Sequence, residues 1–380
     1  MSSPLPGPLP SGARETVVIG AGVTGLASAL ALARRGHPVT VLDAADKAGQ
    51  GVSSRNSQVI HAGIYYPTGS LKARLCVEGR RRLLEFCTTH HVPHALVGKL
   101  VVATSPDEEP ELHRLLAQGQ ANGVDGLELV SSDFVRQKEP QVRATAALWS
   151  PGTEILDVHA LVRALEAECR RLGVTFAFRH RVSAVLPLSP ALSPDGGEGG
   201  KFLLSIDAPD GTFELRAAAV VNAAGLHADS LAGPAAPRQH WVKGSSFRLA
   251  RRRLRHLVYP VPARHLAGLG VHVTVGLDGD TRLGPDVELL EPRREDYAVD
   301  ERRASAFAAA ARRYLPGLTE DELQPDQAGI RPKLSRPGEP WQDFALFEST
   351  RGFVSCLGLE SPGLTACLGV GEYVAGLLER

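Results

Sequence analysis

Hydrophobic and polar positions near the N-terminus follow first the period of a strand and then that of a helix. Residues 16–19 (TVVI) form a short β-branched run that is typical of a buried strand. An apolar, Ala/Leu-rich segment then predicts a helix that reaches about Arg35, where Gly36 ends it. Residues 38–42 predict a second strand, which finishes on Asp43. This order predicts a strand–helix–strand unit at the start of the fold.

The rest of the chain alternates between the two periods. Helices are predicted at 70–91, 106–122, 157–173 and 300–314, and from 361 onward. Strands are predicted at 99–103, 127–130, 146–149, 174–178, 181–186, 201–206, 212–216, 217–221, 241–249, 257–261, 270–276, 281–284 and 352–357. The β-rich part from 241 to 284 is long enough for a separate antiparallel sheet.

Local signals refine these elements. Asp157 is the expected N-cap of its helix, and Asp210-Gly211 predicts a hairpin turn. The low-complexity stretch 189–200 is expected to form a mobile hairpin tip, and the Pro/Gly/Ser-rich residues 1–14 are expected to be disordered.

Composition excludes several classes of protein. Lys+Arg and Asp+Glu both number 42, so no basic excess indicates a nucleic-acid partner. The 5 cysteines are scattered without C-x-x-C pairs, which favours buried free thiols over a disulfide framework or a zinc site. No apolar run is long enough to predict a transmembrane helix. We expect a cytoplasmic protein, with an organelle such as the mitochondrion or peripheral membrane contact left open.

Three glycines after the first strand have the spacing G-x-G-x-x-G. Gly20 permits a tight strand-to-helix turn, Gly22 lets a pyrophosphate approach the backbone, and Gly25 lets helix and strand pack closely. The helix N-terminus offers free N–H groups to phosphates. Asp43 can accept hydrogen bonds from a ribose. Strand, glycines, helix, strand and acid together predict a dinucleotide site.

Three further stretches contain candidate chemistry. The polar loop 49–58 reads either as a solvated connection or as a segment beside a ligand, and His61, Tyr65 and Tyr66 directly after it favour the ligand. The segment 222–225 (NAAG) places small residues at the end of an apolar strand, where nucleotides bind in such sheets. Ser361 is the expected N-cap of the last helix, with Pro362 at its first position.

Arg331 lies in a loop restricted by glycine and proline, Gly329-Ile330-Arg331-Pro332. A guanidinium suits bidentate binding of a carboxylate, although a surface position is the commoner fate of a single arginine.

Long motifs resemble a known family. The chain from about residue 15 to 378 is similar to the flavin-dependent D-amino-acid-oxidase superfamily. Within that superfamily, SSRNSQVIHAGIYYPTGSLKARLCVEGR, VNAAGLHA, GVHVT, AGIRPKL and GLESPGLTACL resemble the L-2-hydroxyglutarate dehydrogenase/oxidase group. Asp43 departs from the glutamate that is frequent in the superfamily, and it is a shorter acid of the same chemistry.

The resemblance implies FAD and a mixed α/β (α+β) fold. No cysteine lies in an evident motif for covalent flavin attachment, so non-covalent binding is expected. A discontinuous Rossmann-like FAD-binding domain would comprise 15–80, 145–235 and 325–380, and an antiparallel-sheet substrate domain 81–144 and 236–324. The expected cofactor-binding residues are Gly20, Gly22, Val23, Thr24, Gly25, Asp43, Ser53, Ser54, Arg55, Asn56, Val182, Ala223, Ala224, Gly225, Ser361, Pro362, Gly363, Leu364 and Thr365.

The resulting hypothesis is oxidation of an L-2-hydroxy acid, with L-2-hydroxyglutarate as the best candidate. The substrate hydride would pass to flavin N5 while His61 or His272 takes the hydroxyl proton. The resemblance implies that Arg331 holds the C1 carboxylate. Lys243, Lys333 and Tyr65 are candidates for a second carboxylate.

Several alternatives stay open at this point. Oxygen and a quinone are both candidate electron acceptors. An oxidase of amino acids or secondary amines, an NAD-dependent dehydrogenase and a non-catalytic flavin-binding subunit are the other classes to separate.

Overall fold

The computed structural model describes residues 13–188, 201–262 and 270–380. The expectations for residues 1–12 and for the stretch 189–200 therefore lie outside the described residues.

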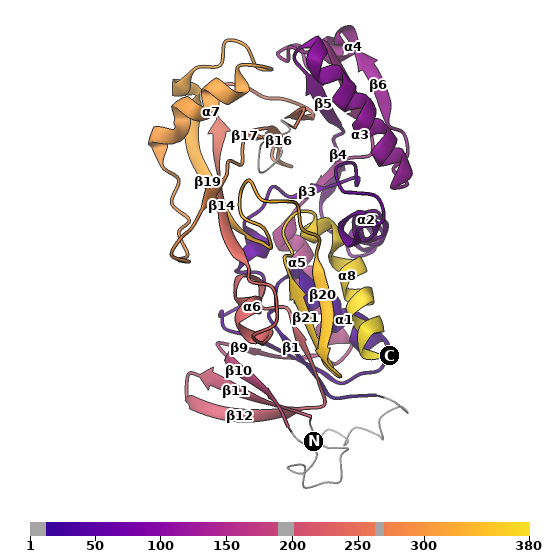
Figure 1. The fold of residues 1–380 in the computed structure, drawn as a ribbon, viewed down its shortest axis with the longest axis vertical. Helices are drawn as coiled ribbons and strands as arrows, with labels where there is room; N and C mark the ends of the chain where they lie inside the picture. The colour runs from indigo at the N-terminus through magenta and orange to yellow at the C-terminus, as the bar shows by residue number, and fades with distance from the viewer. Residues whose placement is uncertain (1–12, 189–200, 263–269) are drawn as a thin grey trace.

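A six-stranded sheet holds the N-terminal strand at its interior and lies in the lower half of Figure 1. Five strands are parallel, and the edge strand β20 is antiparallel. In spatial order the strands are β20 (Ala345–Thr350), β21 (Phe353–Leu357), β13 (Ala219–Asn222), β1 (Thr16–Ile19), β2 (Val39–Asp43) and β9 (Thr175–Phe178). All four residues of β1 are buried. This is expected for a parallel strand whose two faces are both covered.

Helices cover one face of this sheet. They are α1 (Val23–Arg34), α2 (Leu71–Thr89), α5 (Val158–Arg171) and α8 (Gly363–Leu378). Val18 and Val41 point into the core shared with these helices. Helix α8 lies against α1 closely enough that a Cβ on Gly371 would come within 2.4 Å of the Ala27 carbonyl oxygen. The expected N-cap of α5 is confirmed, because the Asp157 side chain accepts hydrogen bonds from His159 and Ala160.

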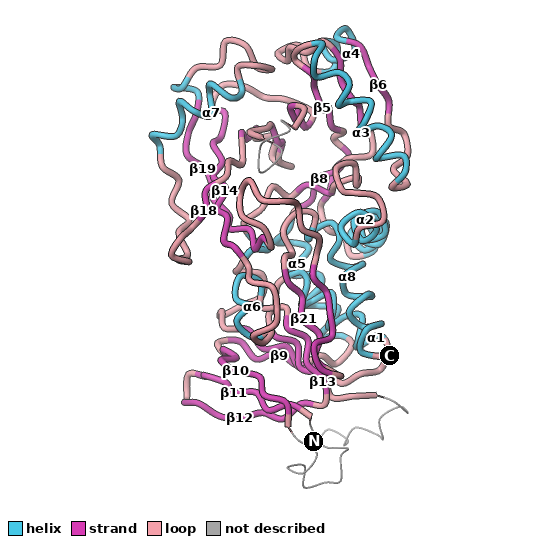
Figure 2. The backbone as a smooth tube through the Cα atoms, in the orientation of Figure 1, coloured by secondary structure: helices cyan, strands magenta, loops and turns pink. Residues whose placement is uncertain are grey.

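A small antiparallel sheet covers the opposite face, at the bottom of Figure 2. Its strands are β10 (Arg181–Pro187), β11 (Phe202–Ala208) and β12 (Gly211–Ala217). Val17, Ile19 and Leu42 point into the core that this sheet shares with the six-stranded one. The alternation along β1 thus explains how one strand faces two layers. The predicted hairpin is confirmed, with Gly211 at φ +126° directly after the turn.

A nine-stranded sheet forms the upper half of the molecule (Figure 1). In order its strands are β18 (Glu288–Leu289), β14 (His240–Leu249), β17 (Thr281–Leu283), β16 (Val273–Val275), β15 (Leu257–Pro260), β5 (Lys99–Ala103), β7 (Ala146–Ser150) and β6 (Glu128–Ser131), with β19 (Leu323–Lys333) paired to β14. Its pairs are antiparallel except β15 with β5. The helices α3 (Glu109–Ala121), α4 (Ser132–Lys138) and α7 (Ala304–Ala311) pack beside it.

Short elements join the two halves. Strands β3 (Val59–Ile60), β8 (Glu154–Leu156) and β4 (His94–Leu96) form a three-stranded antiparallel sheet between them, and α6 (Ala228–Leu231) follows β13. The five cysteines are all buried and free, as expected. Among the described helices, none is both long and apolar enough to cross a membrane.

Strand pairing differs from the sequence-based domain boundaries at two places. Strand β7 begins after residue 145 and was expected in the cofactor domain, yet it pairs with β5 and β6 in the nine-stranded sheet. Strand β19 extends past residue 325 and pairs along its length with β14. The sequence of neither strand identifies its partner, because the pairing joins segments that lie far apart in the chain. We propose that the two domains divide along these sheets.

The start of the terminal helix was predicted one residue too early. Helix α8 begins at Gly363, its N-cap is Pro362, and no side chain caps it. The hydroxyl of Ser361 instead contacts His61 and Tyr66. The prediction of Ser361 as N-cap is therefore wrong, because this serine makes tertiary hydrogen bonds in place of the local one.

Candidate functional site

A cavity of about 850 Å³ lies between the six-stranded and nine-stranded sheets. Gly20, Asp43 and Ala223 line it from the carboxyl ends of parallel strands, which is where open α/β sheets bind ligands. Residues from the nine-stranded sheet line the other end, among them Tyr259 and Arg331. The cavity is large enough for a ligand that reaches across both sheets.

The glycine end of the cavity is shaped by close backbone contacts. Gly20 has φ +102°, and a Cβ there would lie 2.4 Å from the Ala223 carbonyl oxygen. A Cβ on Gly25 would lie 1.8 Å from the Gly20 carbonyl oxygen, so helix and turn touch as the spacing predicted. The N–H of Val23 donates to Ser53 Oγ over 3.0 Å. The polar loop is thereby held across the start of α1, where phosphates bind readily.

Two backbone N–H groups hold the carboxylate of Asp43 at the end of β2. One carboxylate oxygen accepts from the Ala21 N–H at 2.6 Å and the other from the Ala45 N–H at 2.8 Å. A carboxylate has about four acceptor positions, so two remain for ribose hydroxyls.

His61 is the most strongly constrained side chain of the polar segment. The backbone N–H of His61 donates to Thr365 Oγ1 at 3.0 Å, and the Thr365 hydroxyl donates in turn to the Val59 carbonyl. The Nε2 atom lies 3.2 Å from Ser361 Oγ, and the buried Nδ1 atom has no hydrogen-bond partner in the described part of the chain. Burial first, and the positive charge of Lys99 second, lower the pKa of His61 to about 3. The imidazole is therefore neutral at physiological pH.

His272 lies on the opposite wall, against the nine-stranded sheet. Its Nδ1 atom is 2.8 Å from the Gly270 carbonyl, and its ring stacks on Tyr259 with centroids 3.8 Å apart. Burial lowers the pKa of His272 to about 4, with Lys99 and Arg331 adding to the effect. Both imidazoles predicted as proton acceptors are thus neutral and border the same cavity.

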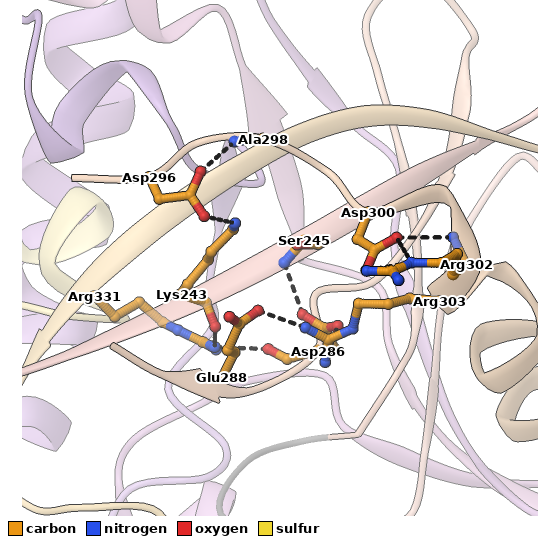
Figure 3. A network of polar contacts seen from close by, with 10 residues as sticks. All are labelled: Lys243, Ser245, Asp286, Glu288, Asp296, Ala298, Asp300, Arg302, Arg303 and Arg331. Carbon is orange, nitrogen blue, oxygen red and sulfur yellow. Dashed lines mark hydrogen bonds and ion pairs between the residues drawn. The ribbon is translucent and has the colours of Figure 1, made fainter. Parts of the chain in front are cut away.

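Arg331 is held by carbonyl oxygens in place of carboxylates (Figure 3). Its Nε atom donates to Val242, and one terminal nitrogen donates to Lys243 and, at 2.7 Å, to Asp286. Burial lowers the pKa of Arg331, and the carboxylates of Glu360 and Asp286 oppose that effect. Within the described residues the other terminal nitrogen makes no hydrogen bond, so two N–H groups remain for a ligand.

The remaining predicted cations are engaged with acids. Lys243 does not line the cavity, and its ammonium lies 2.7 Å from Asp296 (Figure 3). Lys333 lines the cavity and lies 2.5 Å from Glu360, whose other oxygen is 2.9 Å from Lys72. Although burial opposes it, these two lysines lower the pKa of Glu360.

Most of the predicted site residues border one cavity. Those that line it are Gly20, Gly22, Val23, Thr24, Asp43, Ser53, Arg55, Asn56, His61, Tyr65, Val182, Ala223, Ala224, Gly225, His272, Arg331, Lys333, Ser361, Pro362, Gly363 and Leu364. Gly25, Ser54, Lys243 and Thr365 lie outside its lining. Gly25 and Thr365 support residues that do line it, while Ser54 donates to carbonyls of its own loop.

The sequence did not single out three residues of the far end. Tyr259 lines the cavity, Lys72 lines it beside Glu360, and Lys99 lies directly behind Tyr65 and Tyr259. Each belongs to a regular element, so its position in the sequence carries no sign of a site. Lysine in an otherwise apolar strand, KLVVA, is the one signal that was present.

The family model of FAD dependent oxidoreductases matches residues 15–377. The chain belongs to this family and is an FAD-dependent oxidoreductase. It is 38% identical to the mitochondrial L-2-hydroxyglutarate dehydrogenase of Arabidopsis thaliana, covering 96% of this chain and 83% of that protein. It is 30% identical to the human mitochondrial L-2-hydroxyglutarate dehydrogenase, over 100% of this chain and 93% of the other.

Solved structures share the fold. L-α-glycerophosphate oxidase from Mycoplasma pneumoniae with FAD bound superposes with a TM-score of 0.83 at 24% identity, over 97% of this chain and 95% of that one. Glycine oxidase from Geobacillus kaustophilus superposes with a TM-score of 0.77 at 21% identity, over 97% and 95%. The expected mixed α/β fold is confirmed by these neighbours.

The residues of the cavity fit FAD. The glycine turn carries no side chains, and a Cβ at Gly20 or Gly25 would collide with a backbone carbonyl oxygen. The start of α1 offers N–H groups that can bind phosphate. The buried His61 Nδ1 without a partner indicates that a polar ligand completes this part of the cavity.

Proposed function

We propose that this enzyme oxidises L-2-hydroxyglutarate to 2-oxoglutarate. The observation that supports it most directly is the presence of a neutral, buried imidazole and a guanidinium with free N–H groups in one FAD-sized cavity. A 2-hydroxy acid needs both, because its hydroxyl loses a proton and its carboxylate keeps a negative charge. The names of the Arabidopsis and human relatives support this choice of acid.

The glycine turn, Asp43 and the polar loop would hold FAD, and FAD would supply an acceptor for hydride. His61 is the proposed acceptor of the hydroxyl proton, because its imidazole is neutral over the physiological range and has a free lone pair. Its pKa of about 3 makes it a weaker base than an ordinary imidazole. His272 remains the second candidate for this proton, with the same neutral state. Thr365 Oγ1 accepts a hydrogen bond from the His61 backbone N–H, and Ser361 Oγ is hydrogen-bonded to the ring, so both backbone and ring are fixed.

Arg331 holds the C1 carboxylate with its free terminal nitrogen. Its other N–H groups are tied to three backbone carbonyls, so the guanidinium plane is set before substrate binds. A fixed cation orients the C2–H bond and lowers the entropic cost of reaching the reactive geometry.

The test is an anaerobic titration of the purified yellow protein with a panel of acids. L-2-hydroxyglutarate is expected to bleach the flavin absorbance, and D-2-hydroxyglutarate is not. Bleaching by glycine, sarcosine or a D-amino acid, without bleaching by any 2-hydroxy acid, would overturn the proposal in favour of an amino-acid or amine oxidase. Release of flavin on acid precipitation would test the prediction of non-covalent binding.

The electron acceptor and the compartment belong to the same proposal. We propose a quinone or oxygen as acceptor, which oxygen-electrode and quinone-reduction assays on one preparation separate. The cytoplasm remains the proposed compartment, although the Arabidopsis and human relatives are named as mitochondrial. Cell fractionation decides between the two.

A further inference from the structure

Lys99 is a buried cation directly behind two tyrosines that line the far end of the cavity. It is 1% exposed, and its Nζ atom lies 4.6 Å from the ring centroid of Tyr65 and 5.1 Å from that of Tyr259. Within the described residues, Lys99 forms no ion pair. Buried lysines are rare unless they are paired, so this ammonium calls for a compensating anion.

The buried phenol rings of Tyr65 and Tyr259 flank the Lys99 ammonium. The hydroxyl oxygens of Tyr65 and Tyr259 have no hydrogen-bond partner in the described part of the chain, and both residues line the cavity. Buried hydroxyl groups nearly always find an acceptor. Two unmet O–H donors in front of an unpaired ammonium form a place for an anionic oxygen ligand.

Several other cations around the cavity already face acids. Arg55, stacked on Tyr297, and Arg181, at the start of β10, also line it without an ion pair in the described residues. Lys243 contacts Asp296, and Lys333 and Lys72 each contact one oxygen of Glu360. Arg331 is the expected partner of the C1 carboxylate. His272 experiences the charge of both Lys99 and Arg331, so it lies within reach of the two cations. The charge of Lys99 therefore reaches the cavity in addition to the charge of Arg331, which the C1 carboxylate requires.

We propose that Lys99, Tyr65 and Tyr259 form a subsite for the distal carboxylate of a dicarboxylic 2-hydroxy acid. The inference rests on the proposed function and assigns the part of the site that selects a dianion over a monoanion. The two phenols donate hydrogen bonds to the carboxylate, and the ammonium behind their rings supplies the charge. A monocarboxylic acid leaves both phenols and the ammonium unmatched, which such sites discriminate against strongly.

The experiment compares two substrates across variants at pH 7. The kcat/KM values for L-2-hydroxyglutarate and L-2-hydroxybutyrate, which lacks the second carboxylate, are measured for wild type and Lys99→Met. Wild type is expected to prefer the dianion by at least ~100-fold. Lys99→Met is expected to lose about 100-fold on the dianion and less than about threefold on the monoanion. His61 stays neutral in this variant, because burial is the larger cause of its low pKa.

Single-hydroxyl variants keep the inference testable should Lys99→Met not fold. Tyr65→Phe and Tyr259→Phe each remove one donor and are expected to lower the preference for the dianion about tenfold. FAD content, read from the flavin absorbance, reports on folding of every variant.

Lys138→Met is the matched control. Lys138 also lies over two aromatic rings, 5.5 Å from Phe134 and 5.2 Å from Trp149, but neither of these rings lines the cavity, whereas Tyr65 and Tyr259 do. Its loss is expected to leave the substrate preference unchanged. Equal losses on both substrates in Lys99→Met would overturn the subsite, as would a loss of preference in Lys333→Met with none in Lys99→Met.

A binding readout separates this inference from the proposed function. Glutarate and butyrate are titrated against the oxidised protein, and the shift of the flavin spectrum gives their Kd values. Tighter binding of glutarate that is lost in Lys99→Met supports the subsite even when no 2-hydroxy acid reduces the flavin. Equal Kd values for both acids in wild type would sink the subsite while leaving oxidation of 2-hydroxy acids intact.

Discussion

The two ends of the cavity are built in opposite ways. At the glycine end, the backbone makes the shape: Gly20 and Gly25 touch carbonyl oxygens, and Asp43 is held by N–H groups. At the far end, side chains make the chemistry: an ammonium, stacked rings and neutral imidazoles meet from separate strands. The first end requires close packing, and the second requires unpaired polar groups.

This contrast separates binding from selectivity. A cofactor common to a family can be held by a contiguous stretch whose spacing changes little. A substrate differs between family members, and side chains on a sheet can be exchanged without changing the strands that carry them. We therefore expect substitutions at the glycine end to remove the cofactor, and those at the far end to change rates or preference.

The largest effect is expected from Gly25→Val. Its Cβ would meet the Gly20 carbonyl oxygen at 1.8 Å, so helix α1 cannot keep its place against the turn. The variant should purify without flavin or fail to accumulate, and flavin absorbance relative to protein measures this. Gly376→Ala, also in a helix but with open space at its Cβ, is the control and should stay yellow. A Gly25→Val protein that retains its flavin would contradict the expectation that the glycine end binds the cofactor by close packing.

Next in size is His61→Ala. Removing a general base costs about 100-fold or more, and the reduction rate of the flavin by L-2-hydroxyglutarate should fall by that factor. Rapid mixing under anaerobic conditions measures it, with flavin content expected to stay at the wild-type level. A near wild-type rate would transfer the role to His272, and His272→Ala would then carry the loss.

A smaller loss, of about 10- to 100-fold in kcat/KM, is expected for Arg331→Lys. The charge is kept, but an ammonium cannot bond three backbone carbonyls and a carboxylate in one plane. Steady-state kinetics with both L-2-hydroxyglutarate and L-2-hydroxybutyrate should show the same factor, because both have a C1 carboxylate. Unequal factors would place Arg331 at the distal carboxylate.

The smallest effect concerns stability at low pH. The pKa values of His61 and His272 are about 3 and about 4, against roughly 6.5 in an unfolded chain. Between these values the unfolded state binds more protons, so the free energy of unfolding falls as pH drops below about 6.5. Each imidazole contributes up to ~1.4 kcal/mol per pH unit.

Urea unfolding between pH 7.5 and 5.5 measures this loss, with His272→Gln as the comparison. The ring of His272 is faced by Lys99, Arg331, Tyr259, His61 and the Gly270 carbonyl. Lys99, whose pKa burial lowers to about 8, is present in both proteins. The variant should lose less stability on acidification than wild type. Parallel profiles would show that His272 is not held neutral.

The same contrast explains what the sequence could predict. The strands, the helices and the glycine turn follow from local periodicity and spacing, since residues 16–43 are contiguous. The far end depends on the parallel pairing of β15 with β5, which sets Leu257 beside Lys99. No local pattern encodes a pairing between such distant segments, so Lys99 and Tyr259 read only as strand residues. Ser361 was misassigned for the same reason, because a tertiary contact displaced a local cap.

The tie between Thr365 and His61 has a consequence for biosynthesis. Strand β13 pairs with β1 on one side and β21 on the other, and Thr365 in α8 fixes the backbone at His61. Strand β1 and the segment around His61 are therefore completed by parts of the chain that are synthesised much later. Until residues 353–378 emerge, helix α1 lacks the α8 surface that packs against it and β13 lacks its partner β21. Folding helpers are expected to act on this chain during translation.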